Sequence, residues 1–334
     1  MASFELLTGM VAAVAILLVI LTLILEWIVE ARYPAVGAFT EINGMRVHYV
    51  DIPEGAAADL APMIFIHGAS GNARDLYGAF GDRLKGRGRM IFVDRPGAGY
   101  SGRASAADAA PDAQADYVAG LMEQLSITRA IIIGHSLGSA VAAAFGVNHR
   151  DKVAGLVFIA PATHPWAGVD IGWYYRLANT PLLGWLFIHL IAVPFGHLMY
   201  HGAVKEVFWP NRAPHDYAHR SATRLVLRRA NFRHNARDIG RLNDNVARLS
   251  PRYREITAPT VIITGDRDGV VAPDLHARGL ARDIEGARLV WLKDIGHMPT
   301  YSNTDEIIAE IEWLNGRIRE IEAAQMPERP SLET

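Results

Sequence analysis

Short, continuous apolar runs alternate along most of the chain with longer segments of helical character. The apolar runs occupy residues 63–66, 90–93, 131–133, 153–159, 259–264 and 288–292. Helical patterns lie between and after them, at residues 74–85, 112–125, 273–283 and 305–323. Uninterrupted apolar strands separated by helices are typical of a parallel sheet that is covered on both faces. The pattern therefore predicts an α/β fold with a mostly parallel central sheet.

This alternation is preceded by a hairpin pattern and interrupted by one long insertion. Alternating apolar and polar residues flank Asn43-Gly44, which is a strong signal for a two-residue β-hairpin turn. From residue 161 to about residue 250 the pattern is helical and aromatic, with no clear strand, and we expect a helical cap. The chain then divides into an N-terminal membrane segment with its flank (1–32), a first core part (33–160), the cap (161–250), a second core part (251–325) and a flexible tail (326–334).

The N-terminus contains one long apolar run. Residues 6–25 carry no charge, and twenty apolar residues span about 30 Å as a helix, the thickness of a bilayer core. Trp27 follows at the position of an interfacial aromatic residue. The pattern predicts a retained single-pass membrane anchor that lies outside the α/β fold. A signal peptide is the alternative, although no Lys or Arg precedes the run. Arg32 and Arg46 follow the span, which mildly favours a cytoplasmic catalytic domain.

The cap carries two further features that bear on a membrane. Residues 182–193 are apolar all round but short for a bilayer, so they form either a buried cap helix or a lid that enters the lipid interface. Spacings of four predict that Arg220, Arg224 and Arg228 share one helix face. A neighbouring basic stripe follows at Arg229, Arg233, Arg237 and Arg241. This basic surface is either a solvated face paired with acids elsewhere in the chain or a site for anionic lipid headgroups, which contribute about 1 kcal/mol per basic residue.

Composition narrows the chemistry. The chain has 334 residues, half of them hydrophobic, and a net charge of -2, which indicates no nucleic-acid partner. It has no cysteine, so a thiolate nucleophile, a disulfide and a cysteine-ligated zinc site are excluded. The pairs His197/His201 and His215/His219 have the spacing of metal ligands on a helix, but no third ligand converges with them, and we expect no metal. No dinucleotide-binding or Walker motif is present, so we expect no cofactor.

One stretch carries the candidate chemistry. Residues 131–133 run into Gly134-His135-Ser136-Leu137-Gly138, and good helix formers follow. A strand, a G-x-S-x-G turn and a helix are what a nucleophile elbow requires, because small residues must flank a sharp turn that exposes the serine hydroxyl. The alternative is an ordinary strand–turn–helix unit in which the serine is the N-cap.

A serine nucleophile needs a base, and the base needs a carboxylate that orients it. In open parallel sheets these groups lie on loops at the carboxyl ends of strands. Asp266 and Asp268 follow the second-last apolar run, and His297 follows the last one. The order Ser136, Asp268, His297 is that of a triad built on a nucleophile elbow. Asp266 is the rival carboxylate, which we expect to serve the turn after the strand.

Together these motifs resemble the α/β-hydrolase superfamily from residue 39 to about residue 323. The matching features are the Asn43-Gly44 hairpin, His67-Gly68, Asp94-Arg95-Pro96-Gly97 with Gly99 and Ser101, Gly134-His135-Ser136-Leu137-Gly138, Gly265-Asp266-Arg267-Asp268 and Gly296-His297. The resemblance implies the α/β-hydrolase fold with a helical cap.

The resemblance also implies a role for individual residues. Ser136 is the expected nucleophile, His297 the general base and later the general acid, and Asp268 the carboxylate that orients the imidazole. The backbone N–H groups of Ala69 and Leu137 are the expected oxyanion hole. We expect packing and loop hydrogen bonds, rather than chemistry, from His67, His135, Asp94 and Arg95.

A serine at the elbow indicates acyl transfer through an acyl-enzyme. The apolar N-terminus and cap resemble those of membrane-associated monoacylglycerol lipases, so we expect a membrane-tethered serine hydrolase that cleaves apolar carboxylic esters. Its partners would be a lipid or small-molecule ester and membrane lipids. The same triad would also suit a small soluble ester, a lactone, a C–C bond substrate or a cofactor-free perhydrolase. A non-catalytic binding protein is a further alternative, which the intact set of three residues disfavours.

Overall fold

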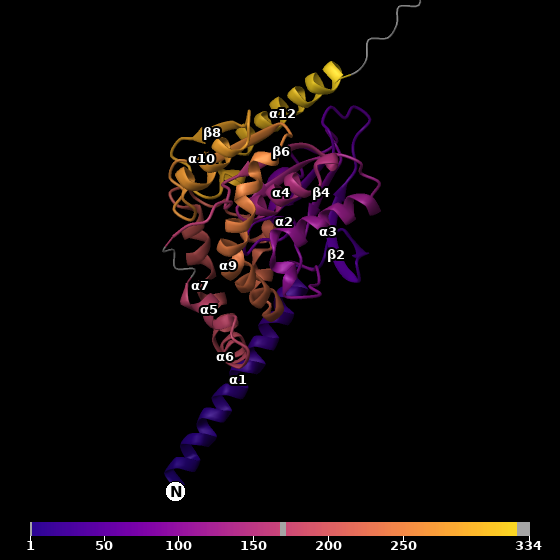
Figure 1. Cartoon of the computed structure of the whole chain (residues 1–334). Coiled ribbons are helices and arrows are strands. Elements are labelled where there is room, and N and C mark those ends of the chain that lie inside the picture. The colour runs from indigo at the N-terminus through magenta and orange to yellow at the C-terminus, as the bar shows by residue number, and fades with distance from the viewer. Residues whose placement is uncertain (1, 168–171, 326–334) are drawn as a thin grey trace, which may run out of the picture.

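Eight strands form one sheet in the residues that the computed structural model describes, 2–167 and 172–325 (Figure 1). The strand order is β1-β2-β4-β3-β5-β6-β7-β8. The β1–β2 and β2–β4 pairs are antiparallel, and all later pairs are parallel. The strands are β1 (Ala38–Ile42), β2 (Met45–Ile52), β3 (Met63–Ile66), β4 (Met90–Val93), β5 (Ala130–His135), β6 (Val153–Ile159), β7 (Thr260–Gly265) and β8 (Arg288–Leu292). The predicted hairpin and mostly parallel sheet are therefore confirmed.

Helices cover both faces of this sheet. On β3, Ile64 and Ile66 belong to the apolar core beneath α3, α4 and α10, whereas Met63 and Phe65 belong to the core beneath α2 and α12. Because each central strand is buried on both faces, its sequence is a continuous apolar run. The covering helices are α2 (Ala73–Phe80), α3 (Pro111–Gln124), α4 (Leu137–Asn148), α10 (Pro273–Asp283), the short α11 (Pro299–Ser302) and α12 (Thr304–Gln325).

The chain between β6 and β7 forms a separate group of helices, with no strand among its described residues. These helices share a small apolar core of their own, which includes Phe187, Val193 and Ala236. Figure 1 shows α5, α6 and α7 at the end of the molecule where α1 emerges, opposite α12. The elements are α5 (Trp173–Ala178), α6 (Leu182–Phe187), the π-helical turn η3 (Ile188–Ala192), α7 (Val193–Phe208), α8 (Tyr217–Ser221), the 3₁₀ turn η4 (Thr223–Leu227), α9 (Arg229–Leu249) and the 3₁₀ turn η5 (Ser250–Glu255).

The prediction that Arg220, Arg224 and Arg228 share one helix face is wrong. Helix α8 ends at Ser221, the next residue Ala222 has a left-handed backbone with φ 50°, and η4 separates α8 from α9. A left-handed residue interrupts the helical repeat, so a spacing of four no longer places side chains on one face. The neighbouring stripe is confirmed, because α9 carries Arg229, Arg233, Arg237 and Arg241.

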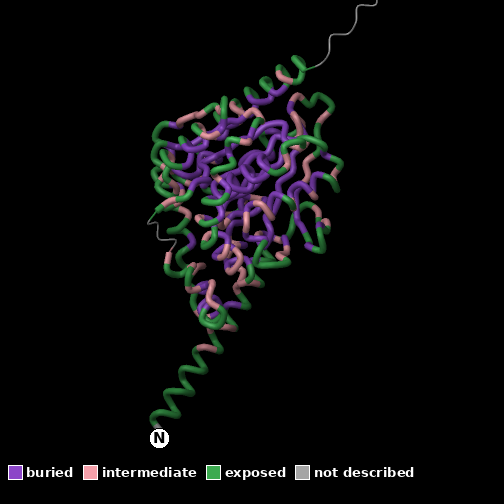
Figure 2. The backbone as a smooth tube through the Cα atoms, viewed as in Figure 1, coloured by how far each residue is buried: buried purple, intermediate pink, exposed green. Residues whose placement is uncertain are grey.

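Two described helical segments are long and apolar enough to cross a membrane, Ser3–Arg32 and Leu182–Phe208. The first lies in helix α1 (Ala2–Arg32), which projects from the body with most of its length exposed (Figure 2). The second covers α6, η3 and α7, and more than a third of its most apolar window is buried inside the molecule. The tail proposed for residues 326–334 lies outside the described residues.

The C-terminal end of α1 is packed into the fold, which corrects the expectation that the whole segment lies outside it. Val29 and Tyr33 are buried in a small cluster with Ala222 and Leu225 of the cap. Burial of apolar side chains on both sides of this contact removes them from water and stabilises it. The N-terminal helix and the cap are therefore one packed unit at this end of the molecule.

Polar contacts join the same two surfaces. Thr22 Oγ1 donates a hydrogen bond to the His189 carbonyl of η3 at 2.6 Å. Glu30 forms an ion pair with Arg228 at 3.0 Å, and Glu26 forms one with Arg229 at the start of α9. Two of the basic residues thus pair with acids elsewhere in the chain, as one of the two alternatives for the basic surface expects.

We predict that Val29→Ala weakens the protein whereas Ile28→Ala does not. Val29 is buried against the cap, while its neighbour Ile28 is 45% exposed. Removing two buried methyl groups and leaving a small cavity should lower the free energy of unfolding by about 1–2 kcal/mol. Denaturant unfolding of the detergent-solubilised chain measures this difference. Equal stability of the two variants would show that α1 does not pack on the cap.

Candidate active site

Ser136 lies at the sharp turn between β5 and α4. Its backbone has φ 53° and ψ -120°, which is unusual for a residue other than glycine and marks a strained turn. Its side chain makes no capping hydrogen bond to the helix behind it, so the simple N-cap alternative fails. The strained turn instead presents the Ser136 hydroxyl to His297.

The glycines of the G-x-S-x-G stretch are required by close backbone packing. A Cβ atom on Gly134 would lie 2.5 Å from the Gly138 carbonyl oxygen, and a Cβ on Gly138 would lie 2.2 Å from the Ile66 carbonyl oxygen. A Cβ on Gly68 would lie 2.9 Å from the Ser136 Cβ. The elbow and the loop after β3 therefore approach each other more closely than any larger residue permits.

Three side chains from three strand ends form one hydrogen-bonded chain. The Ser136 hydroxyl donates to His297 Nε2 at 3.0 Å, and His297 Nδ1–H donates to Asp268 Oδ2 at 2.7 Å. The second carboxylate oxygen of Asp268 accepts from the backbone N–H groups of Val270 and Val271, at 2.8 and 3.0 Å. The three residues follow β5, β7 and β8, at the carboxyl edge of the sheet where the sequence predicted them to meet.

The surroundings of these side chains set their charge. Burial by itself would raise the pKa of Asp268, but the His297 charge and hydrogen bond, with the two backbone N–H groups, hold it below the usual value. Burial, with a smaller effect from the nearby His297, lowers the pKa of His135 to about 4. At neutral pH Asp268 is therefore ionised and His135 is neutral.

The other polar residues of the candidate motifs make hydrogen bonds to the backbone. Asp266 accepts a hydrogen bond from the Asp294 backbone N–H at 2.7 Å and makes no bond to His297. His135 Nε2–H donates to the His297 carbonyl at 3.0 Å. His67 Nδ1–H donates to the Gly68 carbonyl at 2.8 Å, and its Nε2 accepts from the Arg95 backbone N–H. These contacts agree with the packing and turn roles that the sequence suggested for them.

The two backbone groups expected to form an oxyanion hole are free. Among the described residues, neither the Ala69 nor the Leu137 N–H has a hydrogen-bond acceptor. Leu137 is the first residue of α4, so its N–H has no partner within the helix. Ser136 and His297 themselves are only 8% and 3% exposed, so the site is closed in this conformation.

Metal ligands do not gather in the described part of the chain, where no group of three or more His, Cys, Asp or Glu side chains lies together. His197 and His201 both accept hydrogen bonds from the Arg224 guanidinium at 3.2 Å, and a cation next to these rings opposes metal binding. The residues around the candidate triad supply hydroxyl, imidazole and carboxylate groups in one line, which suits proton transfer.

The sequence analysis missed the cap residues that hold the candidate catalytic loops. Asn211, after α7, accepts from the Gly296 N–H at 2.9 Å and donates to the Asp294 carbonyl at 3.1 Å, so it holds the loop that carries His297. Asn235 of α9 holds the loop after β3 in a similar way. Asparagines at these positions carry no local sequence signal, because only the packing of the cap brings them to the site.

Comparison with known proteins identifies the family. The sequence model of the alpha/beta hydrolase fold family matches residues 61–304, and the chain belongs to that family. It is 25% identical over 244 residues to Lipase 3 of Moraxella sp. (strain TA144), covering 71% of this chain and 72% of the lipase. It is also 25% identical over 275 residues to 2-hydroxy-6-oxononadienedioate/2-hydroxy-6-oxononatrienedioate hydrolase of Comamonas testosteroni, covering 79% of this chain and 89% of that enzyme. The chain is therefore a hydrolase.

Solved structures share the same fold. A membrane phospholipase A described as a bacterial virulence factor has a TM-score of 0.66 at 18% identity, covering 96% of this chain and 99% of the phospholipase. The enol-lactonase from Burkholderia xenovorans LB400 has a TM-score of 0.62 at 19% identity, covering 83% and 99%. At these identities the likeness concerns the fold.

We predict that Gly134→Ala disrupts the elbow whereas Gly316→Ala is tolerated. The first substitution forces a Cβ onto the Gly138 backbone, while nothing lies within 4 Å of a Cβ on Gly316. Overpacking against backbone should cost about 1–3 kcal/mol or more, and a surface helical glycine replaced by alanine should gain up to about 1 kcal/mol. Thermal unfolding of both variants checks the signs. A Gly134→Ala protein as stable as wild type would contradict the packing described above.

Proposed function

We propose that this chain is a serine hydrolase that cleaves carboxylic esters, with Ser136 as nucleophile, His297 as general base and acid, and Asp268 as the orienting carboxylate. The observation that carries the proposal is the hydrogen-bonded line from Asp268 through His297 to the hydroxyl of a strained elbow serine. Nucleophile, base and orienting group within hydrogen-bond reach of one another are the signature of an activated serine.

In the proposed reaction, Ser136 Oγ attacks the ester carbonyl carbon while its proton moves to His297 Nε2. The carbonyl oxygen becomes an oxyanion, which the Ala69 and Leu137 N–H groups stabilise. The imidazolium, held by Asp268, then protonates the departing alkoxide, and an alcohol leaves an acyl-enzyme. Water activated by His297 attacks the acyl group, and the second tetrahedral intermediate releases the carboxylic acid and restores the Ser136 hydroxyl. Side chains and water complete every step, so the proposal includes no cofactor and no metal.

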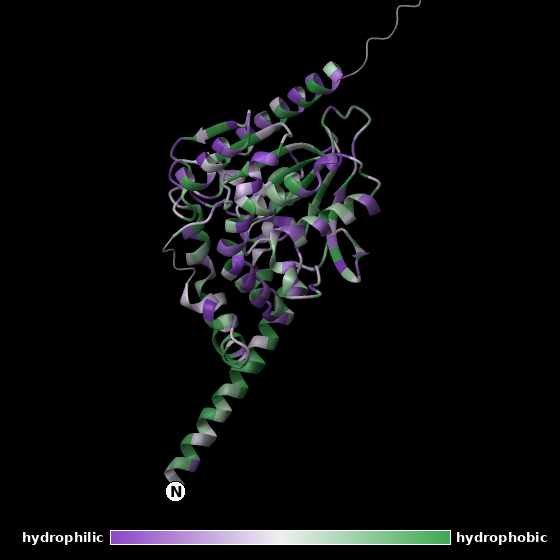
Figure 3. Cartoon of the chain, in the orientation of Figure 1, coloured by the Kyte–Doolittle hydropathy of each residue, from purple (hydrophilic) through white to green (hydrophobic). Residues whose placement is uncertain are grey.

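We further propose that the substrate is an apolar acyl ester, such as a monoacylglycerol-like lipid, reached at a membrane surface. Support comes from the cap helices beside α1, which expose large apolar side chains. Leu198 and Leu182 are 77% and 70% exposed, and Leu183, Phe195 and Met199 are exposed with them. Figure 3 shows hydrophobic residues continuing from α1 onto α6. Of the two expectations for residues 182–193, these exposed side chains favour the lid at the lipid interface.

The contacts of α1 favour a retained anchor over a cleaved signal peptide. Loss of α1 would expose the apolar cluster of Ala222 and Leu225 and leave Arg228 and Arg229 without the acids they pair with. Because Arg228 and Arg229 already pair with acids of α1, we attribute membrane contact mainly to the apolar cap residues and less to these two arginines. The membrane anchor and a cytoplasmic site for the catalytic domain remain part of the proposal.

A second candidate is a hydrolase of a C–C bond, a lactone or another small soluble substrate. The relative from Comamonas testosteroni, named as a 2-hydroxy-6-oxononadienedioate/2-hydroxy-6-oxononatrienedioate hydrolase, is matched over more of its length than the lipase. The exposed apolar cap favours the lipid ester, and chain-length preference separates the two.

We predict that a fluorophosphonate probe labels the full chain in detergent and that Ser136→Ala abolishes the labelling. Loss of the orienting carboxylate in Asp268→Asn should lower kcat by about 10⁴-fold, because the imidazole then takes the wrong tautomer. Asp266→Asn, the matched control, should retain the wild-type rate. The rate should peak with medium or long acyl chains in a nitrophenyl ester series. Absence of labelling in a folded wild type would refute the nucleophile, and turnover of acetyl or butyryl esters alone would favour the soluble substrate.

We predict that the triple variant Leu182→Ser, Leu183→Ser and Leu198→Ser loses activity towards esters embedded in vesicles but keeps its rate on a soluble ester. Removing exposed leucines weakens insertion into lipid without touching the triad. Leu275→Ser on α10, also at an exposed leucine, is the control. The measurement compares the two rates on neutral and anionic vesicles. Equal loss on both substrates would argue against a lipid-facing cap, and binding to anionic vesicles alone would assign the contact to the arginines.

A further inference from the structure

Arg95 makes hydrogen bonds to the backbone of the loop that follows β3. Its Nε donates to the His67 carbonyl at 3.0 Å, and its Nη2 donates to the Gly68 carbonyl at 3.0 Å. His67 Nδ1–H donates to the same Gly68 carbonyl at 2.8 Å. The Gly71 backbone N–H also donates to it, at 3.4 Å. The Gly68 oxygen thus accepts three hydrogen bonds, which fix the orientation of the Gly68–Ala69 peptide.

The direction of that carbonyl determines the direction of the Ala69 N–H. A trans peptide is planar, and its C=O and N–H bonds point to opposite sides. With the Gly68 carbonyl turned towards Arg95, the Ala69 N–H points away from Arg95. Gly68 itself packs against the Ser136 Cβ, so this peptide lies beside the proposed nucleophile. Catalysis by an oxyanion hole depends on donors that are aimed before the reaction begins.

Arg95 is in turn held by the cap. Its Nη1 pairs with Asp238 of α9 at 2.7 Å and with Gln114 of α3 at 3.0 Å, and Arg103 also pairs with Asp238. Arg95 and Asp238 are both buried. Burial lowers the pKa of Arg95, and the Asp238 carboxylate opposes that effect, so each buried charge depends on the other.

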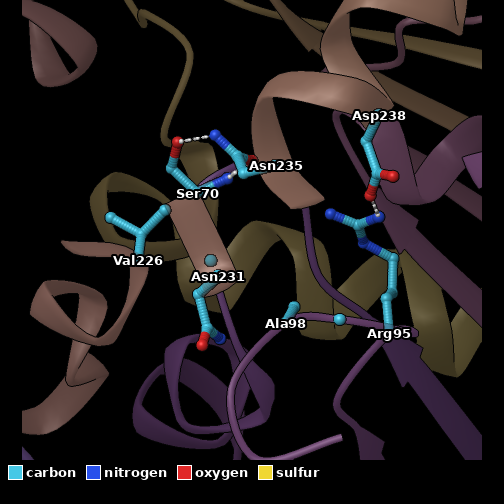
Figure 4. A pocket seen from close by; sticks show the side chains of 9 residues that line it. Ser70, Arg95, Ala98, Val226, Asn231, Asn235 and Asp238 are labelled. Atoms are coloured by element: carbon cyan, nitrogen blue, oxygen red, sulfur yellow. Dashed lines mark hydrogen bonds and ion pairs between the residues drawn. The ribbon is translucent and has the colours of Figure 1, made fainter. Parts of the chain in front are cut away.

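A second contact reaches the same loop from the same helix. Asn235 Oδ1 accepts from the Ser70 N–H at 2.7 Å, and its Nδ2 donates to Ser70 Oγ at 3.1 Å. Ser70 has φ 59°, a left-handed backbone that needs support from its surroundings. Asn235 and Asp238 are three residues apart and share one face of α9. Figure 4 shows the Asn235–Ser70 contact and the Asp238–Arg95 contact around one small cavity.

We propose that Arg95, Asp238 and Asn235 are positioning residues that aim the Ala69 N–H at the developing oxyanion, so that cap helix α9 helps to set the rate of the reaction. This inference rests on the proposed serine-hydrolase function. Ala69 lies between two residues whose backbones are fixed from α9, Gly68 through Arg95 and Ser70 through Asn235.

The test compares Asn235→Ala and Arg95→Lys with Arg89→Lys in the full chain. Arg89 is a matched control, because it also pairs with an aspartate, Asp51, and donates to a backbone carbonyl, that of Leu125, but it lies away from the elbow. A lysine at position 95 keeps the charge for Asp238 but lacks the rigid fork that bonds two carbonyls and a carboxylate together. Kinetics use a soluble nitrophenyl ester, and thermal unfolding reports on folding.

We expect kcat to fall about tenfold to a hundredfold in Arg95→Lys and less in Asn235→Ala, with KM nearly unchanged, because loss of an oxyanion donor costs about 10²–10³-fold and misdirection costs less. Affinity for a trifluoromethyl ketone, which binds as an oxyanion adduct, should fall in parallel with kcat. Arg89→Lys should match wild type. A merely structural role would lower the melting temperature without this coupled change.

Unchanged kcat and unchanged ketone affinity in both folded variants would overturn the inference, as would a loss confined to KM. If Arg95→Lys fails to fold, Asn235→Ala decides the outcome. These results are separate from a failure of the proposed function, which is read from the wild type alone: an unlabelled wild type, or an active Ser136→Ala, would refute the function itself.

Discussion

The close approach of two backbone turns around Ser136 is the constraint on which the site depends. The loop after β3 and the elbow after β5 touch at Gly68 and Gly138, where a Cβ atom would collide with Ser136 or with the backbone of the other turn. Gly134 allows the same close packing within the elbow, against the Gly138 backbone. Ser136 keeps its strained backbone conformation beside this contact. The sheet supplies the rigid frame for it, because β3 and β5 are hydrogen-bonded neighbours.

The cap is part of this arrangement. Helix α9 begins beside α1, where Arg229 pairs with Glu26, and its next turns carry Asn235 and Asp238 against the loop beside Ser136. The single helix therefore contacts α1 at one end and the loop after β3 further along. In the proposed function, α9 therefore connects the end of the molecule nearest the membrane with the loop that supports catalysis.

Local patterns in the sequence predicted most of the fold and the candidate residues. Continuous apolar runs identified the strands of the parallel part of the sheet, because a strand that is buried on both faces carries apolar side chains on both. The candidate residues Ser136, Asp268 and His297 could be found because each lies in the turn or loop that follows such a strand. The prediction of a shared face for Arg220, Arg224 and Arg228 failed, because the spacing of four residues does not reveal that Ala222 is left-handed and ends the helix.

The sequence by itself thus determined the α/β architecture, the elbow and the order of the three candidate residues, all of which depend on short-range patterns and on the common edge of a parallel sheet. Only the tertiary structure decided that Asp268, rather than Asp266, meets His297, and that the end of α1 packs on the cap. It alone brought Asn211, Asn235 and Asp238 to the loops of the candidate site. These contacts join residues more than 80 positions apart through side-chain packing, and no local pattern specifies which polar residue will face which loop.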